Sequence, residues 1–280
     1  MALWKEALKL SFSSLFYHIG KGDFSMEIPK SRSLEIMRQG GVAKCTKLSL
    51  SDSRAIEIAG LSDFDCLWVC TEHVPNDWAV VERQVLAAKA YGKDLLVRVA
   101  RGSYSDMIKP LELDASGIMV PHVMDVEDAR KIVRDTRFYP IGRRPIDGGN
   151  ADGKFCNIEV TEYLRQSNTR KMLIVQIEDK EAEPYVDDIC SVEGIDVVFF
   201  GPGDYSHSLG IPGEINHPKV EEMRKRIARA CHEHGKFAGT TCSPQEVPRI
   251  RAMGYQFIST GGDVLGLHAY FEKCRAAFDA

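Results

Sequence analysis

The chain has 280 residues, of which 44% are hydrophobic and 27% are charged, values ordinary for a soluble globular enzyme. Its formal net charge is −4 with dispersed Lys and Arg, which argues against a nucleic-acid partner, and no apolar run approaches the roughly 18–20 residues of a membrane span. Eight cysteines without a CxxC pair indicate reduced thiols, and therefore a cytoplasmic location.

The N-terminal segment, residues 3–20, is apolar and amphipathic, but it lacks the long apolar centre and the cleavage site of a secretory signal. It also contains Glu6 and no arginine, which is untypical of a mitochondrial presequence. We therefore expect residues 1–30 to form an N-terminal helical extension that packs on the body of the protein or on another subunit. Residues 31–280 are expected to form one catalytic domain.

From residue 31 onward, short apolar runs alternate with longer amphipathic segments, which predicts repeated strand–helix units. One predicted helix covers residues 76–90, where apolar residues recur at helical spacing. Asp77 lies where an N-cap belongs, and Gly92 lies where the helix should stop. The predicted strands are Val42–Leu48, Cys66–Cys70, Leu95–Val99, Gly117–Val123, Met172–Ile177, Val197–Phe200, Lys236–Thr240 and Gln256–Ser259.

Two architectures fit eight parallel strands, a (β/α)8 TIM barrel and an open doubly wound sheet. An open sheet that binds nucleotide typically has a glycine-rich turn after its first strand, whereas residues 49–53, which follow the first predicted strand, contain no glycine. The continuous apolar run at residues 197–200 is typical of a strand that is buried on both faces. We therefore favour the barrel, which places the chain in the α/β class.

In an α/β barrel, catalytic residues lie at the carboxyl ends of the strands. Polar side chains follow or end several of the predicted strands, so these positions define the candidate site. The candidates are Cys70, Glu72, His73, Arg98, His122, Gln176, Glu178, Asp179 and Asp204.

Glu178 and Asp204 are candidate metal ligands, because each carboxylate follows a buried strand. Two oxygen ligands from adjacent strands, with the remaining positions left to water and substrate, suit Mg²⁺ or Mn²⁺. Gln176 lies two residues before Glu178 and therefore faces the same side of its strand. The alternative is that each acid is a solvated strand-end charge or a helix cap.

Arg98 lies inside the apolar run "LLVRVA", where a guanidinium needs an anionic partner. That partner is either a substrate carboxylate or an acidic side chain on a neighbouring strand. His73 is a candidate general base, because histidine is well suited to proton transfer near neutral pH. The alternative is a solvated loop histidine.

Several segments of the chain carry a resemblance to a known family. They read "FDCLWVCTEHVPND", "LLVRV", "ASGIMVPHV", "ARKIVRDTRFYPIGRR", "LIVQIEDKEA" and "GIDVVFFGPGDYSHSLG". Together they resemble the HpcH/HpaI aldolases, the class II pyruvate aldolases that include hydroxy-oxo-heptanedioate aldolases. The similarity extends from about residue 35 to residue 270. The QxE and GPxDxS motifs, in order and at suitable spacing, are the most specific part of it.

The resemblance implies a metal-dependent barrel in which Glu178 and Asp204 bind Mg²⁺, Mn²⁺ or Co²⁺. It further implies that Arg98 and Gln176 contact a pyruvate-like unit, with Asp204 beside it. The backbone at Gly203 would help to hold the carboxylate of that unit. The implied partner is a small 2-oxo acid.

The resemblance also implies a homo-oligomer, a trimer or hexamer, in which the last helix is swapped between subunits. The segment 267–278, "LHAYFEKCRAAF", would then lie on a neighbouring subunit. Its apolar and aromatic residues supply area suited to burial.

The implied reaction is cleavage of a 4-hydroxy-2-oxo acid to pyruvate and an aldehyde, with His73 as the acid/base residue. The family has Asp where this chain has Cys70, and that Asp is expected to orient the histidine. A thiol is a weak hydrogen-bond partner, so Cys70 puts efficient aldol cleavage in question. A second departure is Asp114, at a turn where the family carries glycine.

Two interpretations therefore remain open. The first is an active metal-dependent aldolase or lyase. The second is a catalytically weakened relative that binds metal and a 2-oxo acid, or that acts mainly as a decarboxylase of the oxaloacetate type.

Overall fold

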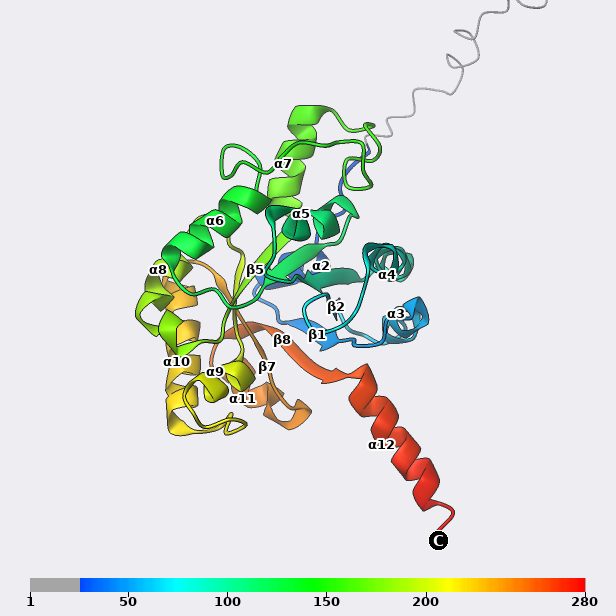
Figure 1. Ribbon diagram of the computed structural model, residues 1–280, viewed down its shortest axis with the longest axis vertical. Coiled ribbons are helices and arrows are strands. Elements are labelled where there is room, and N and C mark those ends of the chain that lie inside the picture. Colours follow the sequence, from blue (N-terminus) through cyan, green and yellow to red (C-terminus); the bar gives the residue numbers. More distant parts are fainter. Residues whose placement is uncertain (1–25, 280) are drawn as a thin grey trace, which may run out of the picture.

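The computed structural model describes residues 26–279, so residues 1–25 of the helical extension predicted over residues 1–30 lie outside the described residues. Within this range eight parallel strands close into a barrel in the order β1 to β8, with β1 paired to β8 (Figure 1). The strands are β1 Ala43–Lys47, β2 Cys66–Cys70, β3 Asp94–Arg98, β4 Gly117–Val120, β5 Met172–Ile177, β6 Val197–Phe200, β7 Phe237–Thr241 and β8 Tyr255–Gly262. The predicted (β/α)8 barrel is confirmed.

Helices surround the barrel in the described part of the chain. The helices are α2 Arg32–Arg38, α3 Ser53–Gly60, α4 Trp78–Ala90, α5 Tyr104–Glu112, α6 Val126–Thr136, α7 Val160–Arg170, α8 Val186–Ser191, α9 Pro202–Ser208, α10 Pro218–Glu233, α11 Val247–Ala252 and α12 Asp263–Ala276, with 3₁₀ turns η2 Lys180–Tyr185 and η3 Pro244–Glu246. Helix α4 begins after Asp77, whose side chain accepts a hydrogen bond from the amide of Val80, and Gly92 follows it with φ +62°. Both ends of the predicted helix are therefore confirmed.

Alternate residues of each strand point into the barrel and fill it with apolar side chains. The interior cluster contains Ala43, Cys45, Cys66, Trp68, Leu96, Met119, Met172, Ile174, Val197, Phe199 and Phe257. Continuing the same alternation toward the carboxyl ends places Lys47, Cys70, Arg98 and Gln176 on the inner face at one end of the barrel. These side chains are polar or ionisable, so the apolar filling stops below them.

Helix α2 closes the opposite end of the barrel. Leu34 and Met37 join the interior cluster from below. The carboxylate of Asp94, at the start of β3, accepts hydrogen bonds from the Ser31 hydroxyl at 2.8 Å and the Ser33 amide at 2.7 Å. The amino end of the barrel is therefore sealed, which leaves the carboxyl ends of the strands as the open face.

Strand β4 ends earlier than predicted. The sequence predicted a strand over Gly117–Val123, whereas β4 stops at Val120. Pro121 cannot donate to a strand ladder, and His122 has φ +51°, in the left-handed region. This turn redirects the chain and carries the side chain of His122 to the carboxyl face.

A buried charge cluster ties the long connection between α6 and α7 to the barrel. Asp114, at φ +69°, pairs with Lys89, Lys154 and Lys171, and its distance to the Lys154 Nζ is 2.7 Å. Asp114 therefore adopts the left-handed conformation that glycine takes most readily. The cluster includes Lys171, just before the amino end of β5, so it lies away from the open face.

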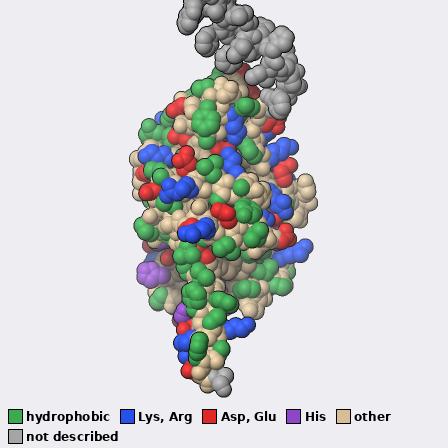
Figure 2. All heavy atoms as spheres, turned by 90° about the vertical axis from the view of Figure 1, so that its right-hand side faces the viewer, with side chains coloured by type: hydrophobic (Ala, Val, Ile, Leu, Met, Phe, Trp, Pro, Cys, Tyr) green, Lys and Arg blue, Asp and Glu red, His purple; other side chains and the backbone are tan. Residues whose placement is uncertain are grey.

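Helix α12 extends away from the barrel, as Figure 1 shows in red. It has no buried residue, and Leu265, Tyr270 and Phe271 are each at least 60% exposed. Hydrophobic side chains are visible along this projection in Figure 2. Among the described helices, none is long and apolar enough to cross a membrane.

Candidate functional site

Three of the candidate residues, Cys70, Glu72 and His73, lie at the end of β2 or just beyond it. The carboxylate of Glu72 lies 3.0 Å from Arg98 Nε and 3.4 Å from His73 Nε2. The Sγ of Cys70 lies 3.4 Å from Arg98 Nε and accepts a hydrogen bond from the backbone N–H of His73 at 3.4 Å. The imidazole of His73 therefore has a carboxylate neighbour, and that neighbour is Glu72 and not the residue at position 70.

The indole of Trp68 lies beneath two cations. The guanidinium carbon of Arg98 is 5.1 Å from the centre of the ring, and Lys47 Nζ is 5.3 Å from it. Cations at such distances are attracted by the negative face of an aromatic ring. Because Lys47 is the last residue of β1, the two cations come from strands that do not pair directly.

Gln176 and Glu178 form the opposite side of the site, on β5 and just beyond it. The Gln176 amide nitrogen donates to the Glu178 carboxylate, and both residues are at least 98% buried. Their expected placement on the same face is confirmed. The Oε1 of Gln176 is buried and has no hydrogen-bond partner among the described residues.

Gly201, between β6 and α9, lies directly against this pair. A Cβ at position 201 would lie 2.4 Å from Glu178 Oε2 and 2.8 Å from Gln176 Nε2. Non-bonded atoms do not approach so closely, so any larger residue would displace the carboxylate. Glycine is therefore required here by the space around Glu178.

Burial raises the pKa of Glu178 to about 7, and the negative charge of Asp204 acts in the same direction, while His122 opposes it. A carboxylate with so little access to water is costly to ionise without a cation.

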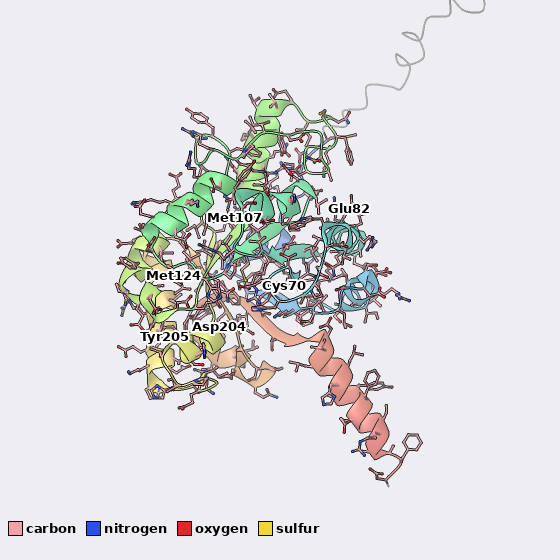
Figure 3. The ribbon with its side chains drawn as sticks, in the orientation of Figure 1. Cys70, Glu82, Met107, Met124, Asp204 and Tyr205 are labelled. Carbon is pink, nitrogen blue, oxygen red and sulfur yellow. The ribbon has the colours of Figure 1, made fainter. Side chains whose placement is uncertain are left out.

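Asp204 and Gly203 lie in the first turn of α9 and are exposed. Figure 3 labels Asp204 and Cys70 near the middle of the ring of strands, whereas Glu82 lies on the outer helix α4. No atom lies within 4 Å of the position where a Cβ of Gly203 would be, so the space beside this backbone is open. The backbone of Gly203 and the side chain of Asp204 are therefore accessible just beyond the carboxyl end of β6.

His122 was noted in the sequence without a role, and the structure gives it three carboxylate neighbours. Its Nδ1 lies 2.9 Å from Asp179 and 3.7 Å from Glu178, and its Nε2 lies 3.7 Å from Glu72. Burial acts to lower the pKa of His122, but these acids together raise it above its usual value. The left-handed turn after β4 could not be inferred from residue type alone, because positive φ is uncommon for any residue other than glycine, even for histidine, which adopts it more often than most.

The residues on this face fit a hard divalent cation. The observations are the buried Glu178 carboxylate, the unpartnered Oε1 of Gln176 and the clearance beside Gly201. Carboxylate and amide oxygens are preferred ligands of Mg²⁺ and related ions. Among residues 26–279, no group of three or more His, Cys, Asp or Glu side chains is arranged around one point.

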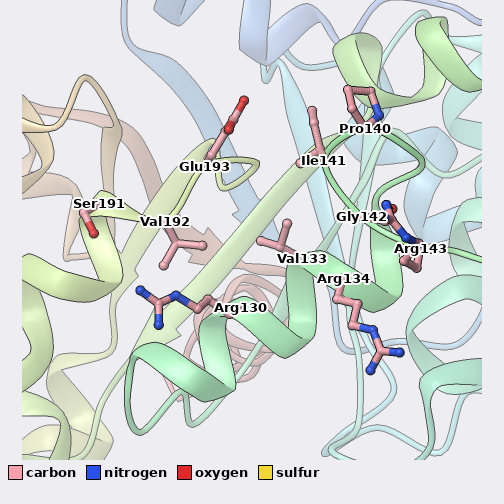
Figure 4. A pocket seen from close by; sticks show the side chains of 10 residues that line it. All are labelled: Arg130, Val133, Arg134, Pro140, Ile141, Gly142, Arg143, Ser191, Val192 and Glu193. Atoms are coloured by element: carbon pink, nitrogen blue, oxygen red, sulfur yellow. The ribbon is translucent and has the colours of Figure 1, made fainter.

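A surface cavity of about 570 Å³ lies elsewhere on the protein (Figure 4). It is lined by α6, the chain just after it, and the turn before β6, and it includes Arg130, Arg134 and Arg143. These segments precede the amino ends of strands. The cavity is therefore separate from the carboxyl-end site.

The family model for "HpcH/HpaI aldolase/citrate lyase" matches residues 48–268, which include every residue of the site except Lys47. The chain belongs to the HpcH/HpaI aldolase/citrate lyase family. Members are aldolases and lyases that make or break carbon–carbon bonds, and the chain is therefore an enzyme of this class. The predicted recognition and the predicted activity class are confirmed.

Two curated relatives show how similar the chain is to other members of the HpcH/HpaI family. The 2-keto-3-deoxy-L-rhamnonate aldolase of Escherichia coli (strain K12) is 34% identical over 233 residues, which are 82% of this chain and 86% of the relative. The enzyme of the same name from Klebsiella pneumoniae subsp. pneumoniae is 33% identical over 219 residues, 78% of this chain and 82% of the relative.

Solved structures of HpcH/HpaI proteins agree with the fold. An HpcH/HpaI aldolase from Desulfitobacterium hafniense DCB-2 is 28% identical with a TM-score of 0.82, covering 87% of this chain and 95% of that one. The citrate synthase SbnG is 28% identical with a TM-score of 0.80, covering 88% and 96%. The family is metal-dependent and acts on small keto acids, which implies a divalent metal ion for this chain.

Proposed function

We propose that the protein is a class II aldolase that cleaves a 4-hydroxy-2-oxo acid to pyruvate and an aldehyde, and that catalyses the reverse addition. The observation that carries this proposal is the buried pair Gln176 and Glu178 beneath Gly201, at the same end of the barrel as Arg98 and Gly203. The names of the curated relatives, 2-keto-3-deoxy-L-rhamnonate aldolases, support the same class of substrate.

Glu178 and Asp204 are proposed to hold Mg²⁺, Mn²⁺ or Co²⁺. When bound, such an ion acts as a Lewis acid toward the carboxylate and keto oxygens of a 2-oxo acid. Gln176 would contact the 2-oxo acid end of the substrate, and the backbone at Gly203 would hold the carboxylate at that end. The substrate would thus be oriented from β5 and β6.

Arg98 is proposed to stabilise the negative charge that develops on the substrate. Its Nε is held by Cys70 and Glu72, which fixes the plane of the guanidinium, while its Nη groups make no hydrogen bond to the described residues. These free donors can meet the C2 oxygen as the enolate forms. Donors that are held in place before the reaction stabilise such charge most effectively.

His73 is proposed to accept the proton of the 4-hydroxyl group. As the C3–C4 bond breaks, its electron pair moves toward C2, which gives the enolate of pyruvate and releases the aldehyde. Protonation of C3 then completes the cleavage. Glu72, at 3.4 Å from His73 Nε2, would stabilise the protonated imidazole.

Cys70 supports a second candidate function. The thiol of Cys70 accepts hydrogen bonds from the backbone N–H of His73 and from Nε of Arg98. Position 70 therefore provides no hydrogen-bond partner for the imidazole of His73. Decarboxylation of a molecule such as oxaloacetate needs the metal site and Arg98 but no base at a 4-hydroxyl group. An enzyme weakened in proton transfer would retain that reaction.

We further propose that α12 exchanges between subunits of a homo-oligomer, a trimer or hexamer. The exposed apolar side chains of α12 support this proposal, since an isolated helix with such a surface gains stability by being covered. A cytoplasmic location is proposed from the reduced state expected of the cysteines. In the described residues all eight cysteines are unpaired by disulfide bonds.

One experiment separates the two candidate functions. The protein is incubated with Mg²⁺ or Mn²⁺, pyruvate and a panel of aldehydes, and adducts are quantified beside the decarboxylation of oxaloacetate. Adduct formation that a chelator abolishes supports the aldolase, whereas decarboxylation without adducts supports the second function.

Variants test the metal site itself. Glu178→Gln should lose Mn²⁺ binding and both reactions, while Glu181→Gln, which changes an exposed acid in η2, should keep them. Unchanged Mn²⁺ affinity in Glu178→Gln would reject the proposed site.

A further inference from the structure

Another cavity, the amino-end cavity, lies where strands β7 and β8 begin, at the opposite end of the barrel from the proposed active site. It is lined by residues of α10 from position 225 onward, by residues 235–238 and by residues 253, 254 and 256. Its volume is about 490 Å³, within the range of roughly 300–1,000 Å³ that is typical of small-molecule sites. The proposed aldolase mechanism does not use this cavity.

Basic side chains line the amino-end cavity, and no acidic side chain of the described residues does so. Lys225 and Arg229 come from α10, and Lys236 comes from the segment before β7. His232 follows Arg229 by three positions and therefore lies on the same face of α10. In contrast, the cavity beside α6 includes the acid Glu193 among its arginines. The amino-end cavity therefore has a positive lining that suits an anion.

The three cations of the amino-end cavity have no acidic partner. Within residues 26–279, the side chains of Lys225, Arg229 and Lys236 form no ion pair and no hydrogen bond. A neighbouring arginine on α10 differs, because Arg226 pairs with Asp187 at 3.1 Å. The unpaired charges are therefore a property of the cavity and not of the whole helix.

Lys236 gives the strongest indication that the cavity holds an anion. It is half-buried, and burial lowers its pKa, while the charge of Asp196 acts in the opposite direction. The Asp196 carboxylate is already held by Arg137 at 2.6 Å and by the backbone amide of Leu173 at 2.8 Å. An ammonium group that loses water without a close acid is destabilised, so an anion in the cavity would stabilise it.

Apolar side chains form another part of the lining. They belong to Ala228, Cys231, Phe237, Ala238 and Met253. The space beside them is open, because no atom lies within 4 Å of the Cβ position at Gly235 or Gly254. An inorganic anion would leave this apolar surface in contact with water, whereas a ligand with an apolar body would bury it.

We propose that the amino-end cavity binds a phosphate ester with an aromatic body. The phosphate would lie among Lys225, Arg229 and Lys236, since a phosphate monoester carries nearly two negative charges and three acceptor oxygens, more than one carboxylate offers. Arginine and lysine are well suited to such groups. The aromatic ring would pack against Phe237 and Met253, because rings and thioethers both attract an aromatic partner.

Calorimetric titration with 1-naphthyl phosphate tests this proposal, because the compound joins a flat apolar ring to a phosphate. The Mg²⁺-loaded full-length protein should bind it at least ~10-fold more tightly than inorganic phosphate or 1-naphthol, since each of these lacks one half of the expected contacts. Inorganic phosphate or 1-naphthol that binds as tightly as the ester would overturn the proposal.

Variants locate the binding site. Arg229→Gln and Lys236→Met should each weaken the binding of 1-naphthyl phosphate at least ~10-fold, as expected for hydrogen bonds to a charged group. Arg226→Gln is the matched control, because Arg226 lies on the same helix but pairs with Asp187 and does not line this cavity. Melting curves confirm that each variant is folded. Equal weakening in Arg226→Gln and Arg229→Gln would indicate a general attraction of charge and would refute the site.

Oxalate separates this site from the carboxyl end of the barrel, where Lys47 and Arg98 could also attract an anion. With Mg²⁺ and saturating oxalate, the affinity for 1-naphthyl phosphate should stay the same. Displacement of the ester by oxalate would overturn the proposal and leave the proposed aldolase function standing. Aldol adduct formation should be unchanged in Arg229→Gln, and its loss would contradict the independence of the two sites.

Discussion

The Sγ of Cys70, the last residue of β2, lies 3.4 Å from Nε of Arg98, the last residue of β3. The same sulfur accepts the backbone N–H of His73. A carboxylate at position 70 would therefore find two donors already in place. Cys70, in place of the aspartate that the family resemblance implies, removes a negative charge from this position. The two N–H donors, on Arg98 and His73, remain in place.

Replacement of Cys70 by aspartate tests this arrangement. We expect Cys70→Asp to fold, because the new carboxylate would be paired with Arg98 and not left as an isolated buried charge. Aldol cleavage should rise by part of the roughly 10²–10⁴-fold that general acid–base catalysis supplies. Decarboxylation of oxaloacetate should change less, because it does not need the 4-hydroxyl base.

The measurement is kcat for both reactions together with a melting curve. Metal affinity should stay the same. A fall in both the melting temperature and the aldol rate would mean that position 70 has no part in supporting His73.

Gly201→Ala tests the space around Glu178. Its Cβ would lie 2.4 Å from the carboxylate oxygen, and Gly201 has φ −96°, so no backbone strain is added. We expect Mn²⁺ affinity to fall at least ~10-fold, as for the loss of a charged ligand contact, while the melting temperature changes little. Gly203→Ala is the control, because no atom lies within 4 Å of its Cβ. Equal Mn²⁺ affinities in the two variants would contradict the proposed ligand.

Arg98→Lys tests whether Arg98 binds a ligand through the geometry of its guanidinium group or through its positive charge alone. A lysine retains the positive charge but cannot keep Nε on Glu72 while presenting two further N–H groups to a ligand. Oxalate binding to the metal-loaded protein should weaken by about 10-fold or more, given the usual strength of charge-assisted hydrogen bonds. Arg101→Lys, at a surface ion pair with Asp128, should bind oxalate normally. If both variants bind oxalate like the wild type, Arg98 has only a structural role.

Asp114→Asn tests the buried cluster that ties the long connection to the barrel. Although burial acts to raise it, the charge of Lys171 and hydrogen bonds from the three lysines hold the pKa of Asp114 well below its usual value. Removing the charge leaves Lys171 buried without its partner, and breaking such a pair costs about 3–5 kcal/mol. The free energy of unfolding at pH 7 should fall by that order.

The pH dependence of this effect has a defined sign. Because the folded-state pKa of Asp114 is depressed, its stabilisation is complete above the unfolded carboxyl value of about 3.9 and is lost as the pH falls below it. The difference in unfolding free energy between wild type and Asp114→Asn should therefore be equal at pH 7 and pH 5 and smaller at pH 3. Urea titrations at the three pH values measure it. A difference that grows toward acid would refute the assignment.

Truncation after Gly266 tests the role of α12. The helix has no buried residue in the described structure, so its removal should leave the barrel folded. Light scattering should show an oligomer for the full chain and a smaller species for the truncated one. A full-length protein that runs as a monomer of 31.3 kDa would reject the exchanged helix.

The sequence by itself determined the strands, the order of the elements and which polar residues stand at the carboxyl ends of the strands. The apolar runs are local, and each ends in a residue whose type already suggests chemistry, as Glu178 and Arg98 do. Gln176 and Glu178 could be placed on one face because side chains alternate along a strand. These features depend on neighbours within a few residues, which is why pattern reading recovered them.

Only the tertiary structure decided which of these residues meet. Closure of the barrel brings Lys47 and Arg98, 51 positions apart in the chain, onto the same indole. It also places Glu72 against Arg98 and near His122, and it surrounds Asp114 with lysines from three separate segments. The strength of a charge contact depends on distance and burial, and neither is encoded in spacing along the chain. For that reason the carboxylate beside His73 and the position of Lys47 over Trp68 emerged only from the folded barrel.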